Sequence, residues 1–68
     1  MDRYYINTQA AEDGVHEVHR EGCERMPDLT FARYLGDYPH CHDAIEDAQD
    51  YYTSTNGCFS CCRECNNR

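Results

Sequence analysis

The sequence predicts a small α+β domain in which one amphipathic helix packs across a three-stranded antiparallel sheet, with metal or disulfide bonds stapling the fold. Three observations lead to this prediction. Short runs rich in aromatic and β-branched residues precede a single run with helical spacing. The chain has 68 residues, a length that suits one domain, 1–68, with a thin apolar core. It also carries six cysteines and four histidines, whose disulfide or metal bonds would stabilise a domain with so small a core.

Three runs are expected to form the sheet. Residues 3–7, RYYIN, and residues 15–19, VHEVH, are predicted to be two strands of a hairpin joined by a polar turn. Residues 31–38, FARYLGDY, alternate in polarity and are predicted to form the third strand. The intervening segment, 20–30, is interrupted by Pro27 and is expected to be a loop or a single helical turn.

The helix is predicted over residues 39–52, PHCHDAIEDAQDYY. Pro39 suits the first helical position, where a missing N–H group is no loss. Apolar residues then recur with helical spacing and form one continuous stripe: Cys41, Ala44, Ile45, Ala48, Tyr51 and Tyr52. Asn56 and Gly57 supply the turn that ends the segment. Cys41 should therefore face the core, either as a small buried side chain or as a disulfide or metal partner.

The charge and the N-terminus indicate the compartment and the partners. Thirteen acidic residues against six arginines give a net charge of −7, which is unsuited to neutralising phosphates, so direct nucleic-acid binding is not expected. A basic protein is the expected partner, unless the charge serves solubility alone. No run approaches the roughly 20 apolar residues that a membrane span needs. MDRYYINTQA lacks the pattern of a secretory signal, so we expect a cytoplasmic protein with reduced thiols.

Two pairs of residues have the spacing of a zinc site. His19 and Cys23 form H-x-x-x-C after the second strand, and Cys58 and Cys61 form C-x-x-C after the helix. Tetrahedral zinc commonly takes two such pairs from separate chain segments. The sequence therefore predicts one structural zinc on these four residues. Two further cysteines repeat the C-x-x-C spacing one step along and are alternate ligands: Cys62 and Cys65.

Two other uses of the thiols stay open at this point. Structural disulfides are the first alternative, and they are favoured if the protein works outside the cytosol. One of the C-terminal cysteines would then be able to pair with Cys41. A redox-active dithiol is the second alternative, but the sequence has no lysine and no clear helix N-terminus that would lower a thiol pKa.

The same residues carry two resemblances to known proteins. H-x-x-x-C, a strand, an amphipathic helix and C-x-x-C, over residues 15–61, resemble the zinc-binding domain of the alkylation-repair protein Ada. That resemblance implies the same four zinc ligands, without Ada's methyl transfer. The chain is more closely similar to small bacterial His/Cys proteins, a resemblance that implies no established activity and rests on YYIN (4–7), HEVH (16–19), Cys23, YLG (34–36), Cys41 and GCFSC (57–61).

The polar side of the predicted helix is acidic. Its carboxylates recur at i, i+3, i+4 and i+7, where like charges destabilise a helix by roughly 0.2–0.5 kcal/mol per pair; they are Asp43, Glu46, Asp47 and Asp50. They are either solvated surface or a row of charges that imitates nucleic-acid phosphates, with Asp37 widening the row.

The predicted function is therefore non-enzymatic. The acidic row would bind a basic, nucleic-acid-handling protein as a nucleic-acid mimic, as in phage or mobile-element inhibitors such as anti-CRISPR proteins. The alternative is a housekeeping structural-zinc module accessory to DNA repair or metal handling. No catalytic role is expected, because the sequence has no Ser–His–acid order, phosphate-binding glycine loop or positioned carboxylate pair.

Overall fold

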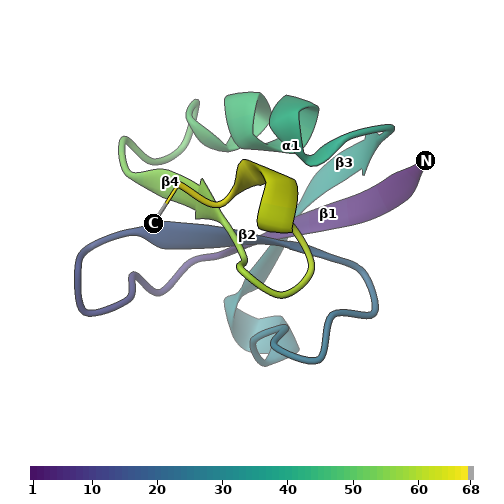
Figure 1. The fold of residues 1–68 in the computed structure, drawn as a ribbon. Helices are drawn as coiled ribbons and strands as arrows, with labels where there is room; N and C mark the ends of the chain where they lie inside the picture. Colours follow the sequence, from purple (N-terminus) through teal and green to yellow (C-terminus); the bar gives the residue numbers. More distant parts are fainter. Residues whose placement is uncertain (68) are drawn as a thin grey trace.

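A computed structural model describes residues 1–67 of the chain and shows a small α+β fold (Figure 1). One helix, α1, lies across one face of the sheet, and the C-terminal segment lies beside it. This arrangement confirms the predicted fold class. In chain order the elements are β1 (Asp2–Asn7), β2 (His16–Arg20), the 3-10 helix η1 (Leu29–Phe31), β3 (Ala32–Tyr38), α1 (Cys41–Ala48), β4 (Thr55–Gly57) and the 3-10 helix η2 (Arg63–Cys65).

The sheet has four strands in the order β3-β1-β2-β4, so the prediction of three antiparallel strands is wrong in part. β1 pairs antiparallel with both β2 and β3, as expected for the hairpin and the third strand. β4 pairs parallel with β2, opposing Thr55 to His16 and Gly57 to Val18. The segment was expected to be a turn, because Asn and Gly are rare in strands. Its hydrogen bonds to a distant strand outweigh that local preference.

The core lies between the sheet and α1. Successive side chains of a strand point to opposite faces, so Tyr4 and Ile6 of β1 face the helix while Tyr5 does not. Tyr4 and Ile6 are fully buried, whereas the half-buried Tyr5 packs on the ring of Tyr34, with centroids 5.5 Å apart. The buried cluster beneath α1 comprises Tyr4, Ile6, Val18, Cys41, Ala44, Ala48, Cys62 and Cys65.

The helix is shorter than predicted, because it spans Cys41–Ala48 and not residues 39–52. His40 precedes it in an extended conformation (φ −140°), so Pro39 lies outside the helix. Beyond Ala48 the chain turns, and the ring of Tyr52 stacks on His16 with centroids 3.7 Å apart. That stacking explains why the apolar stripe continues although the helix does not.

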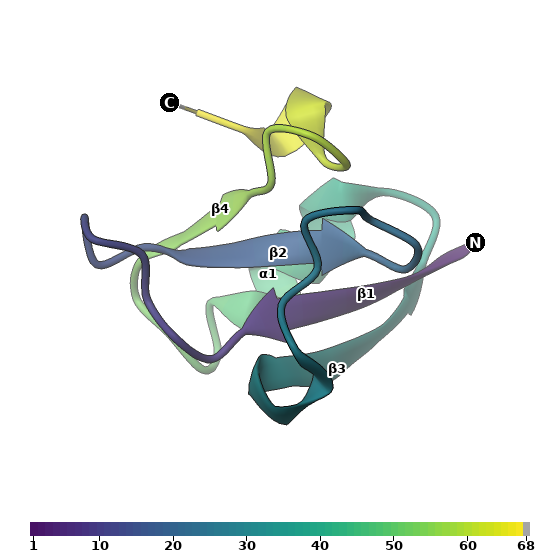
Figure 2. The ribbon, with the colours of Figure 1, turned by 90° about the horizontal axis from the view of Figure 1, so that it is seen from below.

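A disulfide between Cys41 and Cys65 joins the start of α1 to η2. Cys41 is therefore in the core, as predicted, and is covalently paired there. The segment between β2 and β3 crosses the face of the sheet opposite α1 (Figure 2). Within residues 1–67, no helix is long and apolar enough to span a bilayer.

A candidate metal centre

His19, Cys23, Cys58 and Cys61 bring one ligand atom each into a group whose members all lie within 4.8 Å of one another. Cys23 Sγ is 3.7 Å from His19 Nδ1 and 3.9 Å from Cys58 Sγ, and Cys61 Sγ is 4.0 Å from His19 Nδ1. Around one tetrahedral zinc, bonds of about 2.0–2.3 Å would place neighbouring ligand atoms roughly 3.5–3.8 Å apart. The cluster could therefore hold a metal ion with little rearrangement.

Two chain segments position the four side chains. His19 is the penultimate residue of β2, and a tight turn then brings Cys23 back to it, with the Cys23 N–H donating to the Arg20 carbonyl (3.0 Å). Gly22 has φ +87° in this turn, a conformation that favours glycine. Cys58 follows β4 directly, and its N–H extends the β2–β4 pairing by donating to the Val18 carbonyl (2.9 Å). The parallel pairing therefore aligns the two segments.

Backbone N–H groups surround the sulfurs. The N–H groups of Arg25, Ser60 and Arg20 lie 3.4, 3.4 and 3.2 Å from the sulfurs of Cys23, Cys58 and Cys61, respectively, and donate to them. Hydrogen bonds of this kind stabilise thiolate charge and orient the ligands of a metal. Three of the four candidate ligands thus already have the surroundings that a metal-bound thiolate needs.

Glu17 is a part of the centre that sequence reasoning missed. Its carboxylate Oε1 lies 3.8 Å from His19 Nε2, the ring nitrogen that faces away from the sulfurs. A carboxylate behind a histidine ligand orients the ring and raises its basicity. The signal was present in HEVH (16–19), because residues two apart in a strand share a face.

Burial sets the protonation of the cluster when no cation is bound. The His19 side chain is only 2% exposed, and this burial lowers its pKa despite the opposing charge of Glu17. The imidazole is therefore neutral, as a metal ligand must be. Burial likewise raises the pKa of the Cys61 thiol. A bound cation would offset that cost by stabilising the thiolate, so metal binding should release protons.

The other two C-terminal cysteines lie elsewhere. Cys62 is fully buried in the core cluster, where desolvation raises its thiol pKa, and Cys65 is bonded to Cys41. The structure therefore places neither of these alternate ligands in the group around His19. The four C-terminal cysteines do not share one helical turn, because in the described part of the chain after β4 only Arg63–Cys65 is helical.

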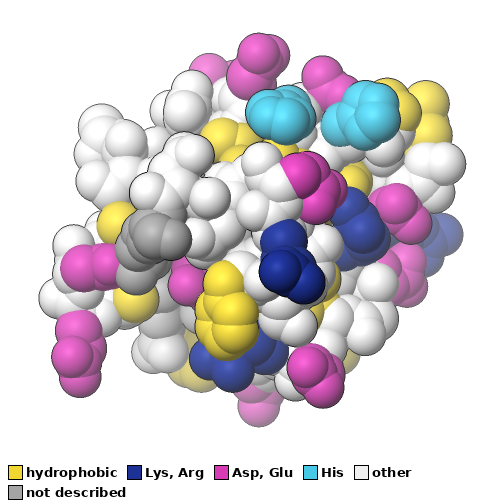
Figure 3. Space-filling model, viewed as in Figure 1, with side chains coloured by type: hydrophobic (Ala, Val, Ile, Leu, Met, Phe, Trp, Pro, Cys, Tyr) yellow, Lys and Arg dark blue, Asp and Glu magenta, His cyan; other side chains and the backbone are white. Residues whose placement is uncertain are grey.

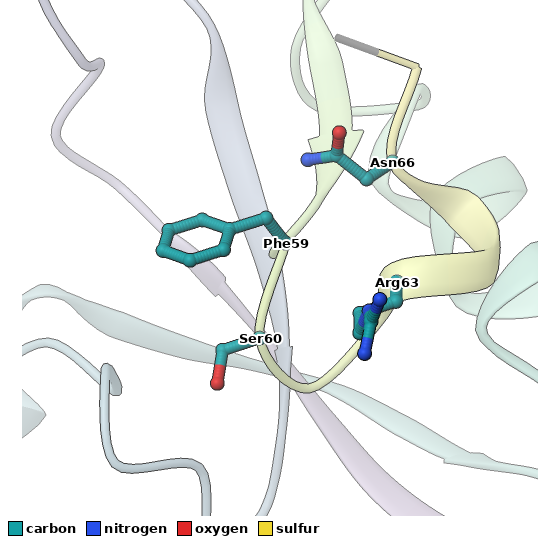
Figure 4. Close-up of a pocket in the computed structure, with 4 residues that line it drawn as sticks. All are labelled: Phe59, Ser60, Arg63 and Asn66. Carbon is teal, nitrogen blue, oxygen red and sulfur yellow. The ribbon is translucent and has the colours of Figure 1, made fainter.

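A shallow hollow lies beside the loop that carries Cys58 and Cys61 (Figure 4). Its lining residues are Phe59, Ser60, Arg63 and Asn66. Phe59 is 53% exposed, and the guanidinium of Arg25 lies over its ring at 4.4 Å from the centroid. The lining offers no second histidine, thiol or carboxylate, so this hollow adds no ligand to the metal centre.

The acidic row predicted from the sequence is largely assembled in the structure. Asp43, Glu46, Asp47 and Asp50 line one shallow hollow together with Tyr38 and Pro39. Figure 3 shows acidic side chains along the upper rim of the molecule, the side on which α1 lies in Figure 1.

Two of the acidic residues have other partners. The Tyr38 hydroxyl donates to Asp47, and this hydrogen bond raises the pKa of Tyr38 to about 12. Asp37 is not part of the row. It accepts from the Tyr34 hydroxyl, lies 3.9 Å from Arg3 and lines a separate hollow with both residues. The alternation of β3 explains this, because Asp37 and Tyr38 point to opposite faces.

No protein-family model, curated protein or solved structure matches this chain. The two resemblances drawn from the sequence motifs therefore stay predictions. The argument for metal binding therefore depends on the distances among the four candidate ligands.

Proposed function

We propose that the protein is a small non-enzymatic module whose fold depends on one zinc ion bound by His19, Cys23, Cys58 and Cys61. The observation that carries this proposal is the convergence of four ligand atoms, from two distant segments, within 4.8 Å of one another. Three thiolates and one imidazole are a donor set that zinc takes in structural sites. Four protein ligands leave no open position for water or substrate, which supports a structural role.

The test is the metal content of the protein and its link to folding. With the Cys41–Cys65 disulfide intact, one zinc per chain is expected by elemental analysis and native mass spectrometry. A chelator should abolish the cooperative unfolding transition, because binding free energy is folding free energy in such domains. Cys58→Ser and Cys61→Ser should lose the zinc, whereas Ser60→Ala, in the same loop, should keep it. A metal-free protein with disulfides among Cys23, Cys58 and Cys61 would overturn the proposal.

A second function is supported by the hollow that the acidic row lines. Asp43, Glu46 and Asp50 are exposed there, and α1 carries no lysine or arginine that would neutralise them. We propose that this face binds a basic, nucleic-acid-handling protein in place of nucleic acid, as an inhibitor of phage or mobile-element origin would. Zinc would then only hold the scaffold. A zinc module accessory to DNA repair or metal handling is the competing assignment.

Partner capture at two salt concentrations tests this second function. The variant Asp43→Asn, Glu46→Gln and Asp50→Asn should lose binding to a basic nucleic-acid-handling protein, and high salt should weaken wild-type binding because ions screen the charges. The variant Glu12→Gln, Glu21→Gln and Glu24→Gln removes the same charge from other surfaces and should bind normally. If both variants captured the partner equally well, the acidic row would be solvated surface without a role in binding.

A further inference from the structure

A second group of ligand atoms lies at the start of α1, away from His19. The sulfurs of Cys41 and Cys65 and a ring nitrogen of His42 all lie within 4.8 Å of one another. The two cysteines are 0% and 4% exposed and are joined as a disulfide, whereas His42 is exposed. An imidazole at the surface therefore stands beside a buried cysteine pair.

We propose that Cys41, His42 and Cys65 form a second metal site that is controlled by redox state: when the disulfide is reduced, the two thiolates and the imidazole bind zinc. Two thiolates and one histidine are an established zinc donor set, with a fourth position left for another ligand. None of these residues belongs to the His19 group, so the two sites can fill independently. This inference does not depend on the zinc proposed at His19.

The surroundings supply a candidate for the fourth position. Glu64 Oε1 lies 3.3 Å from Cys41 Sγ, so this carboxylate is next to the cysteine pair. The same oxygen accepts from Arg20 Nη2 at 3.1 Å, which holds the carboxylate in place. Either this carboxylate or a water molecule would complete a tetrahedral shell with the three ligands.

The location explains what a metal would do there. The disulfide ties the N-terminal end of α1 to η2 across the core cluster. Reduction alone would remove that tie from a domain whose core is small. A zinc ion bound by the same two sulfurs would restore the cross-link, so the fold would be stapled in both redox states. The difference between the states would be whether His42 is free at the surface or bound.

Low-molecular-weight thiols of the cell can supply the two electrons that reduction of the disulfide requires. Two equivalents of a low-molecular-weight thiol reduce the Cys41–Cys65 bond to two thiols and become one disulfide. Zinc then binds as the two cysteine protons leave. In the reverse direction a low-molecular-weight disulfide takes up the two electrons, the Cys41–Cys65 bond forms again, and the zinc ion is released.

The experiment counts zinc on the full chain in its oxidised and reduced forms. Each form is incubated with excess zinc, the reduced form after treatment with a phosphine reductant, and both are desalted and weighed by native mass spectrometry. The reduced protein should carry one zinc more than the oxidised protein. His42→Ala should lose that extra zinc, whereas His40→Ala, an exposed histidine two residues earlier, should keep it.

His42→Ala also separates this site from the centre at His19, because His42 does not belong to that group. The variant should keep the zinc that the oxidised protein carries and lose only the extra zinc of the reduced protein. The double variant Cys41→Ser and Cys65→Ser should bind the same amount of zinc with and without reductant. If the double variant does not fold, His42→Ala alone tests the proposal. Equal zinc content in the two wild-type forms, or an extra zinc that survives His42→Ala, would overturn the proposal.

Discussion

Val18 and His19 are neighbours on β2 whose side chains are buried on opposite faces of the sheet. Val18 packs in the core cluster beneath α1, while His19 Nδ1 lies 3.7 Å from Cys23 Sγ in the candidate metal centre. The carbonyl of Val18 also accepts from Cys58, another candidate ligand. One short strand therefore supports both the core and the candidate metal centre. A substitution in the core should lower the zinc affinity, and loss of the zinc should destabilise the core.

Val18→Ala should destabilise the protein by about 2 kcal/mol, since it removes two methyl groups from a fully buried site and leaves a small cavity. Denaturant unfolding at saturating zinc measures this loss. Val15→Ala, at a half-buried position just before β2, should cost clearly less. Equal losses for the two variants would contradict the placement of Val18 in the core.

Gly57→Ala should destabilise the protein by about 2–3 kcal/mol, because the structure leaves no room for a side chain there. An added Cβ would lie 2.7 Å from the Cys62 carbonyl oxygen and 2.8 Å from the Cys65 Cβ. Because Gly57 directly precedes Cys58, zinc affinity should fall as well. Thermal unfolding and zinc competition measure the two effects. A Gly57→Ala protein with wild-type stability would show that β4 does not pack against η2 in this way.

Cys58→Ala and Cys62→Ala should differ in zinc content. Cys62 is a buried core residue, so its replacement should cost about 1 kcal/mol of stability while one zinc remains bound under oxidising conditions. Cys58→Ala removes a proposed ligand and should abolish binding at that centre. Elemental analysis of the two purified variants checks the prediction. Loss of zinc from Cys62→Ala with the metal retained in Cys58→Ala would make Cys62 the ligand.

Tyr38 should titrate later than a free phenol. Its hydroxyl donates to Asp47, and this raises the pKa of Tyr38 to about 12 from the ordinary value of 10.0. The folded state thus favours the protonated phenol, so the stabilisation is fully present below pH 10 and is lost as the pH rises toward 12. Ultraviolet absorbance of tyrosinate follows the titration. The late component should lose the contribution of one tyrosine in Tyr38→Phe, while Tyr34 and Tyr4, whose pKa values are also raised, still contribute. It should be unchanged in Tyr51→Phe.

Local patterns in the sequence were enough to predict much of the fold. Alternation identified the strands around Tyr4, Val18 and Leu35, and helical spacing placed Cys41 in the core. Both signals depend on residues a few positions apart, which share a face whatever the rest of the chain does. The spacings H-x-x-x-C and C-x-x-C are local in the same sense. They identified the four residues that the structure brings into one group.

Other features depended on contacts between distant segments, and only the tertiary structure decided them. Thr55–Gly57 is a strand because β2 offers it parallel hydrogen bonds, although its own residues favour a turn. Tyr52 lies beyond the end of α1, and its ring stacks on His16, a residue far earlier in the chain.

The positions of the last cysteines were decided in the same way. Spacing alone allows Cys58, Cys61, Cys62 and Cys65 to exchange places, since all four recur at similar intervals. The path of the chain after β4 turns Cys58 and Cys61 toward His19, and it turns Cys62 and Cys65 into the core beside Cys41. The sequence by itself determined which residue types could bind a metal, because that is a property of the side chains. Which of them meet was decided by strand pairing and packing, which join segments that the sequence keeps far apart.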